Sequence, residues 1–184
     1  INDDVKFFEN ALQIMYETYR MTNAHVVIVG ACKSAVTGEQ TYGGRDGKGN
    51  IISPSMQLKK CIWANWNCFL IDKYVVDHVG IIDCKLQHPF GDFEYSFRMN
   101  KYGVEIFISK DYVGECEINS KEGTCADKNV PRMLRLKKLF SPKGIPPYSY
   151  FRYNFKIEGI KGLLKSVYGY CSLIYYIFAG KDLN

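Results

Sequence analysis

The sequence predicts an α+β domain in which an N-terminal helix packs on a mostly antiparallel, twisted β-sheet. Apolar residues recur at three- and four-residue spacing across Asp3–Arg20, and apolar and polar residues alternate strictly across Phe93–Met99. The 14 Tyr and 11 Phe residues bring the aromatic share to 15%, which favours a β-rich core. The length of 184 residues suits a single domain spanning residues 1–184.

The first expected element is the helix over Asp3–Arg20. Its apolar face is formed by Val5, Phe8, Leu12, Met15 and Tyr19. The apolar run Ala24–Val29 then predicts a short buried strand that ends at Gly30. The segment Thr37–Asn50 holds five glycines and no aliphatic residue, so we expect a long Gly-rich exposed loop there.

A hairpin is expected at the centre of the sheet. Its strands are Phe93–Met99 and Val104–Ser109, joined at Asn100–Gly103, where Asn and Gly tolerate a positive φ. In the first strand, Glu94, Ser96 and Arg98 would share the solvent face. Further strands are expected at Leu58–Trp63, Cys68–Ile71, Tyr74–Ile82, Tyr112–Ile118, Tyr148–Glu158 and Tyr170–Phe178. Arg132–Lys138 fits a basic strand or a helical turn, and Gly162–Tyr168 fits a short helix.

Seven cysteines are spread along the chain without a C-x-x-C pair, which argues against zinc-ribbon and thioredoxin-type sites. This usage favours disulfides formed in an oxidising compartment, and therefore a secreted, disulfide-stabilised protein. Cys116 and Cys125 flank a polar turn and are the favoured pair, and Cys61 and Cys68 could close a second loop. Because the count is odd, at least one thiol stays free or pairs with another chain. The alternative is a cytosolic protein whose buried thiols act as small hydrophobic side chains.

The motifs of several classes of site are missing. Gly43 and Gly47 miss the P-loop spacing by one residue, and no G-x-G-x-x-G pattern follows a strand, so no nucleotide cofactor is expected. His, Asp and Glu are not paired at metal-ligand spacing, so neither a metal nor another cofactor is predicted. The longest apolar run, Cys171–Ala179, is too short to cross a bilayer, and no transmembrane segment is expected.

One group of residues has the chemistry for catalysis. His88, Glu94 and Arg98 lie within eleven positions of one another. Metal-free cleavage of RNA by 2′-OH attack needs a carboxylate base, a histidine acid and an arginine that holds the phosphate. The structural alternative is that Glu94 and Arg98 form an exposed ion pair worth about 0–1 kcal/mol, and that His88 is a loop residue.

Two basic, aromatic stretches could bind an anionic partner. The candidate contact residues are Arg132, Arg135, Lys137, Lys138, Tyr148, Tyr150, Arg152 and Lys156, with the tyrosines as stacking surfaces for bases or sugars. The formal net charge of +5 adds a mild preference for anionic partners. The alternative is a solvated sheet face whose charges block edge pairing.

The sequence therefore predicts a secreted interaction protein, effector- or toxin-like and with a role in virulence, that binds a host or extracellular macromolecule without catalysis. The expected partner is a protein or an anionic macromolecule, with RNA and glycan as candidates. The second hypothesis is a secreted ribonuclease-like enzyme that uses His88, Glu94 and Arg98. A cationic membrane-surface protein ranks third, because it would need a free Asp3–Arg20 helix, and that helix begins with acidic residues.

Overall fold

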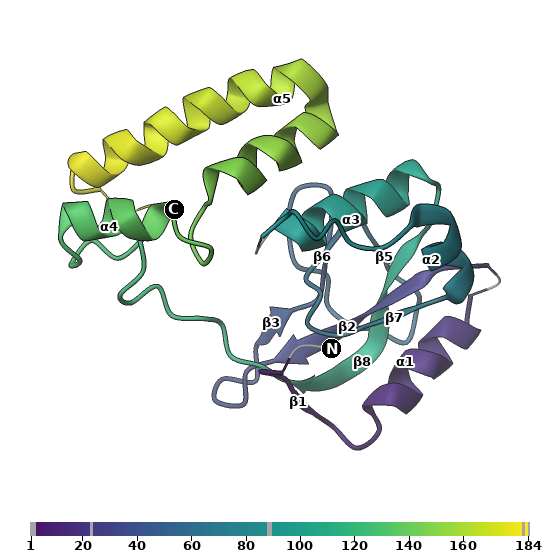
Figure 1. Ribbon diagram of the computed structural model, residues 1–184. Helices are drawn as coiled ribbons and strands as arrows, with labels where there is room; N and C mark the ends of the chain where they lie inside the picture. The colour runs from purple at the N-terminus through teal and green to yellow at the C-terminus, as the bar shows by residue number, and fades with distance from the viewer. Residues whose placement is uncertain (1–2, 23, 88–89, 182, 184) are drawn as a thin grey trace. The chain divides into compact units, whose positions relative to one another are not determined.

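The computed structural model describes residues 3–22, 24–87, 90–181 and 183. The chain divides into two compact units. The single domain expected from the sequence stays a prediction. We call residues 1–82 and 95–118 the α/β unit, and residues 83–94 and 119–184 the helical unit. Figure 1 traces the chain through both. Each unit is described separately below.

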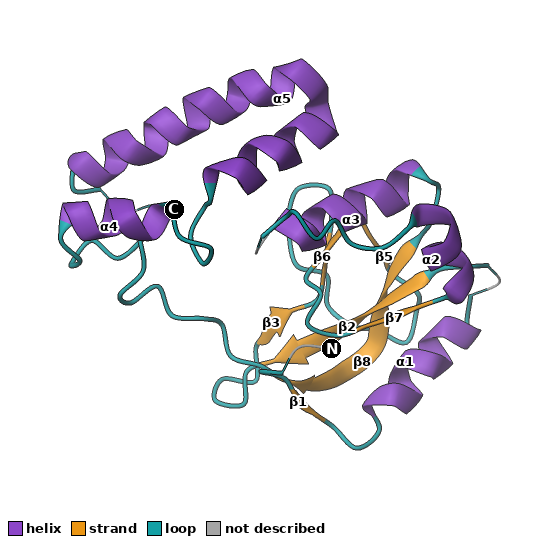
Figure 2. Ribbon diagram, viewed as in Figure 1, coloured by secondary structure: helices purple, strands orange, loops and turns teal. Residues whose placement is uncertain are grey.

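The α/β unit is built on a mixed sheet, shown in orange in Figure 2. Its central strands, β2 (Val27–Lys33) and β8 (Ile106–Glu115), run parallel. The shorter strands pair antiparallel with these two: β1 (Lys6–Phe7), β3 (Gln40–Tyr42), β5 (Lys60–Cys61) and β7 (Phe69–Ile71). A small second sheet joins β4 (Gly44–Arg45) to β6 (Trp63–Ala64). The α+β class is therefore confirmed, but the central pair of the sheet is parallel.

Helices cover both faces of this sheet. Val26 and Ile28 face α1 (Ala11–Arg20), where they form one buried core with Met15. Val27 and Val29 face the opposite side, where they pack with residues of α2 (Lys73–Val79) and α3 (Phe90–Lys101). The prediction of an N-terminal helix on a sheet is thus confirmed, although the helix begins at Ala11 and follows a short strand.

The predicted central hairpin is wrong, because Phe93–Met99 is part of helix α3. Tyr95, Ser96 and Met99 are all buried, and this i, i+1, i+4 pattern is the burial pattern of a helix. The expected strand at Tyr74–Ile82 is likewise mostly α2, which begins after Asp72. The two predicted strands at Val104–Ser109 and Tyr112–Ile118 form one long strand, β8.

The expected Gly-rich loop contains two short strands, β3 and β4, and ends in a tight turn. The Asp46 side chain accepts hydrogen bonds from the backbone N–H groups of Lys48 and Asn50, at 2.8 and 2.9 Å. These bonds order the turn, so the segment is only partly the open loop that its composition predicts.

The helical unit consists mainly of α4 (Arg132–Leu139) and α5 (Pro147–Phe178). The strands predicted at Tyr148–Glu158 and Tyr170–Phe178 are therefore wrong, whereas the helix predicted at Gly162–Tyr168 lies inside α5. At Gly159 the backbone has φ 61° and ψ −138°, and the helix folds back on itself there, as Figure 1 shows. We call residues 147–158 the first arm and residues 160–178 the second arm.

Small residues let the two arms approach closely. A Cβ added at Gly162 would lie 2.0 Å from the carbonyl oxygen of Asn154, so only glycine fits there. Ser166, one turn further along, is fully buried. The core of the helical unit is completed by Leu139, Tyr170, Ile177 and Leu183.

All seven cysteines are free thiols, so the predicted disulfide framework is not supported. Cys61 and Cys68 belong to the two different cores of the α/β unit, on opposite faces of the sheet. This explains why the proposed Cys61–Cys68 pair does not form, and the Cys116–Cys125 pair is also absent. Burial raises the pKa of Cys61 to about 12, which keeps its thiol protonated and unreactive. Cys32, Cys61, Cys68 and Cys116 act as small buried hydrophobic side chains, as the alternative interpretation held.

No helix among the described residues is both long enough and apolar enough to cross a membrane. This agrees with the absence of a transmembrane segment expected from the sequence.

Candidate functional site

The charges of the chain are distributed very unevenly. Residues 119–184 contain twelve Lys and Arg against four Asp and Glu, a formal net charge of +8. Residues 1–118 contain twelve Lys and Arg against fifteen Asp and Glu, a net charge of −3. The modest total of +5 is therefore the sum of a strongly basic C-terminal segment and a weakly acidic remainder. An anion-binding site is expected in the C-terminal segment.

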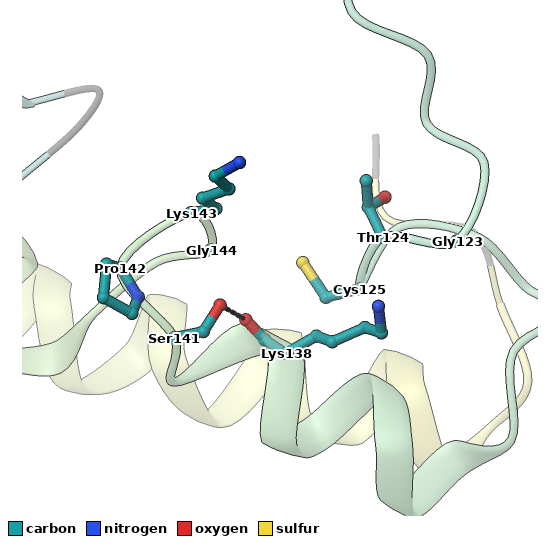
Figure 3. A pocket seen from close by; sticks show the side chains of 8 residues that line it. All are labelled: Gly123, Thr124, Cys125, Lys138, Ser141, Pro142, Lys143 and Gly144. Atoms are coloured by element: carbon teal, nitrogen blue, oxygen red, sulfur yellow. Dashed lines mark hydrogen bonds between the residues drawn. The ribbon is translucent and has the colours of Figure 1, made fainter.

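A pocket of about 460 Å³ lies in this segment and is drawn in Figure 3. We call it the basic pocket. It is lined by Gly123, Thr124, Cys125, Lys138, Ser141, Pro142, Lys143 and Gly144. Its two lysines are potential donors to an anionic group, whereas the Ser141 and Thr124 hydroxyls already donate to the carbonyl oxygens of Lys138 and Lys121.

The loop that forms one wall of the basic pocket is fixed by backbone geometry. The Ser141 hydroxyl donates to the Lys138 carbonyl at 2.7 Å, and the Ile145 N–H donates to the Leu139 carbonyl at 2.8 Å. A Cβ added at Gly144 would lie 2.2 Å from the Lys138 oxygen, so only glycine allows this approach. The loop therefore folds back over the end of α4 and brings Lys143 to the same pocket as Lys138.

The pocket is electrostatically suited to an anion and not to a nucleophilic reaction. Figure 3 shows the Cys125 sulfur directed into the space between the two loops. Burial raises the pKa of the Cys125 thiol, which keeps it neutral at physiological pH. Lys138 and Lys143 supply the positive charge, and nothing in the pocket supplies a negative one.

The predicted contact residues fall into two groups. Arg132, Lys137 and Tyr148 are exposed, and Lys138 lines the basic pocket, so these four are available to a partner. The others are used by the fold. Tyr150 is half-buried and packs against Phe90, Phe151 and Tyr170.

Arg135, predicted as a contact residue, is only 1% exposed. Its guanidinium donates to the carbonyl oxygens of Cys125 and Lys181, both at 2.9 Å. It therefore joins three separate segments of the helical unit and is not accessible to a ligand.

Arg152 and Lys156 belong to an ion-pair cluster in which the side chains of the two carboxylates are largely buried. Asp83 accepts from Arg152 Nε at 2.9 Å and pairs with Lys156 Nζ at 2.6 Å, and Glu94 accepts from the same Lys156 at 2.9 Å. Burial raises the pKa of Asp83, but the hydrogen bonds from Lys156 and Arg152 and from a backbone N–H outweigh it and lower the pKa to about 2. The cluster attaches the first arm of α5 to residues 83–94 of the same unit.

The residues of the ribonuclease hypothesis have structural partners. His88 lies outside the described residues. Glu94 is 3% exposed and bonded to Lys156, and Arg98 donates to the carbonyl oxygens of Val79 and Ile81, both at 2.8 Å. Glu94 and Arg98 do lie one turn apart on one helix, but this placement gives the ribonuclease hypothesis no support.

Sequence reasoning missed Lys143 and Thr124 as site residues. They reach the basic pocket from two loops, and their proximity depends on long-range packing that no local pattern encodes. The available signal was Gly144 between two nearby prolines, Pro142 and Pro146, which indicates a constrained turn. Within the described ranges, no group of three or more His, Cys, Asp and Glu side chains could hold a metal ion.

Comparison of the chain with models of known protein families, with curated proteins and with solved structures finds no match. The features of the chain that bear on function are therefore its charge distribution, the basic pocket and the exposed surface of the helical unit.

Proposed function

We propose that this protein is a non-catalytic binding protein that engages an anionic macromolecule through its C-terminal segment, residues 119–184. The observation that carries this proposal is the net charge of +8 on that segment against −3 on the rest of the chain. A charge of this size raises the local concentration of anionic partners and speeds their association.

Three features of the segment add support. Arg132 and Lys137 are exposed on α4, so their charges face solvent. Lys138 and Lys143 converge on the basic pocket, which is large enough for a phosphate, sulfate or carboxylate group. Tyr148 is 60% exposed at the start of α5 and could stack on a planar or sugar ring.

The test compares two double variants that each remove two positive charges. Lys137→Gln with Lys143→Gln changes the C-terminal segment, and Lys48→Gln with Lys101→Gln changes exposed lysines of the α/β unit. Fluorescence anisotropy with labelled heparin, as a model polyanion, is recorded at several salt concentrations. If both lysines contact anionic groups, the first variant lowers the slope of log affinity against log salt by about 1.4–1.8, while the control leaves it unchanged.

Equal effects of the two double variants would contradict the proposal, because binding would then depend on total charge alone. A wild-type chain that does not bind heparin at low salt would also contradict it.

Secretion stays a separate prediction. It rested on the expected disulfides, and the free thiols of the structure remove that argument. The intact mass of the natural protein with and without reductant tests it. A mass that changes on reduction would restore the case for an oxidising compartment.

A further inference from the structure

The second arm of α5 carries a continuous line of exposed apolar side chains. We call it the apolar stripe. It consists of Ile160, Leu164, Val167, Tyr168, Cys171, Tyr175 and Phe178. Successive residues of a helix are rotated by about 100°, so these seven side chains fall within roughly 100° of the helix circumference. The stripe extends along the whole second arm, the long run of α5 that ends in yellow in Figure 1.

At the start of the second arm the burial is inverted relative to a helix on a water-soluble core, whereas further along Tyr170 and Ile177 are buried in the core of the unit. Ile160 and Leu164 are 75% and 68% exposed, whereas Gly162 and Ser166 on the opposite face are buried. A helix that met only water on its outer face would place the large apolar residues inward and the small or polar ones outward. Its outer face therefore has the composition expected for contact with a second apolar environment.

The cations around the stripe indicate what that environment is. Lys161 and Lys165 lie on the same arm beside the stripe, and both are exposed. Lys165 pairs with Glu158 at 2.6 Å, but both groups are solvent-exposed, so the pair is weak enough to exchange for another anion. At the end of the arm, Lys181 lies 5.9 Å from the ring centre of Tyr175. Tyrosine and lysine flanking an apolar face are typical of helices at a lipid–water interface.

The positive charge of the segment argues against a second copy of the chain as the partner that covers the apolar stripe. Pairing two stripes would bring together two segments that each carry a net charge of +8. An anionic bilayer satisfies both features at once, since acyl chains accept the apolar side chains and headgroup phosphates accept the lysines.

We propose that the second arm of α5 lies along the surface of an anionic lipid bilayer. The apolar stripe is buried at the boundary between headgroups and acyl chains, and Lys161, Lys165 and Lys181 contact headgroup phosphates. The helix lies on the membrane and does not cross it, in keeping with the lack of a membrane-crossing helix among the described residues. This inference rests on the proposed function and names its anionic partner as a lipid surface.

From the sequence, a membrane-surface role ranked last because the helix expected to carry it, Asp3–Arg20, begins with acidic residues. In the structure the candidate membrane-binding helix is α5, for which the sequence partly predicted strands. The relevant i, i+4, i+7 spacing of Ile160, Leu164 and Val167 becomes visible only when the segment is a helix.

The test is co-sedimentation of the full chain with vesicles of phosphatidylcholine alone and of phosphatidylcholine mixed with phosphatidylglycerol. The test variants are Leu164→Glu and Val167→Glu in the stripe. The matched controls are Leu12→Glu and Val36→Glu, which change exposed residues of the same types in the α/β unit. Circular dichroism confirms that all four variants keep the wild-type fold, as substitutions at exposed positions should.

The wild-type chain is expected to bind the anionic vesicles and to bind the neutral ones far more weakly. Each stripe variant should lose about tenfold or more in affinity, since a charge replaces a buried apolar group, while each control loses less than about twofold. Stripe variants that bind like the wild type would overturn the inference.

Heparin binding separates this inference from the proposed function. A chain that binds heparin but no vesicle keeps the proposed function and overturns the lipid surface. A chain that binds neither polyanion nor vesicle overturns both. Concentration-dependent dimerisation that Leu164→Glu abolishes, without vesicle binding, would assign the stripe to a second copy and overturn the inference.

Discussion

The Asp83 cluster allows a stability prediction with a defined pH dependence. Asp83 pairs with Lys156 Nζ at 2.6 Å and with Arg152 NH2 at 2.8 Å, and its side chain is only 10% exposed. Burial raises its pKa, but the hydrogen bonds from Lys156 and Arg152 and from a backbone N–H prevail and bring it to about 2, from an ordinary value of 3.8. A shift of this size corresponds to about 2 kcal/mol of stability for the helical unit at neutral pH. Asp83→Asn removes this contribution.

The sign of this pH dependence follows from the direction of the Asp83 pKa shift. The pKa is lower in the folded than in the unfolded chain, so the carboxylate stabilises the fold above the unfolded value. That stabilisation is lost as the pH falls toward, and then below, the pKa of Asp83 in the folded chain. The difference in unfolding free energy between the wild type and Asp83→Asn should therefore be about 2 kcal/mol near pH 7 and roughly half of that near pH 3.

The assay is urea unfolding followed by far-ultraviolet circular dichroism at both pH values. The matched control is Asp77→Asn, because Asp77 also pairs with a lysine, Lys73, at 2.6 Å but is 54% exposed on its side chain. This exposed pair should contribute no more than about 0.5 kcal/mol. A difference for Asp83→Asn that does not shrink on acidification, or that matches the Asp77→Asn control, would refute the reasoning.

Three further changes test other parts of the fold. Arg135→Met should lower the unfolding free energy by about 2–4 kcal/mol, because two buried carbonyl groups lose their donor; an unchanged urea midpoint would contradict this. Gly162→Ala should cost about 1–3 kcal/mol because the arms of α5 must separate, whereas Gly47→Ala, with open space around it, should be neutral in thermal unfolding. Asp72→Ala removes the N-cap bond to the Tyr74 N–H at 2.7 Å together with the contacts from the Tyr19 hydroxyl at 2.6 Å and His25 Nδ1 at 2.8 Å, and should lower the unfolding free energy by about 1–3 kcal/mol; an unchanged melting temperature would contradict this.

The parts of the fold that were predictable are those in which local pattern and tertiary environment agree. In α1 a helix was predicted and Met15 is on its buried face, although Leu12 of the predicted apolar face is 72% exposed. In β2 an apolar run packs against helices on both sides. At Phe93–Met99 the local pattern and the tertiary environment disagree. Alternation favoured a strand, but Tyr95 and Met99 lie one turn apart and share a core, which the local pattern alone does not distinguish.

The prediction of a strand in the second arm of α5 was wrong for a related reason. Tyr170–Phe178 is rich in aromatic and β-branched residues, which favour strands by propensity. The small residues Gly162 and Ser166 upstream allow close helix packing, and that packing outweighs the propensity. The basic character of the C-terminal segment was predictable from composition, but the burial of Arg135 was not, because its carbonyl partners, Cys125 and Lys181, come from distant segments.

The most direct test of the central claim places a reporter on the apolar stripe. Cys171 lies in the stripe and Cys84 lies outside it, and both thiols are exposed, so each can carry an environment-sensitive fluorophore once the other thiol and the half-buried Cys125 are replaced by serine. On addition of anionic vesicles, the emission from Cys171 should shift to shorter wavelength while that from Cys84 stays unchanged. A label on Cys171 that reports unchanged water exposure on chains bound to the vesicles would contradict the account.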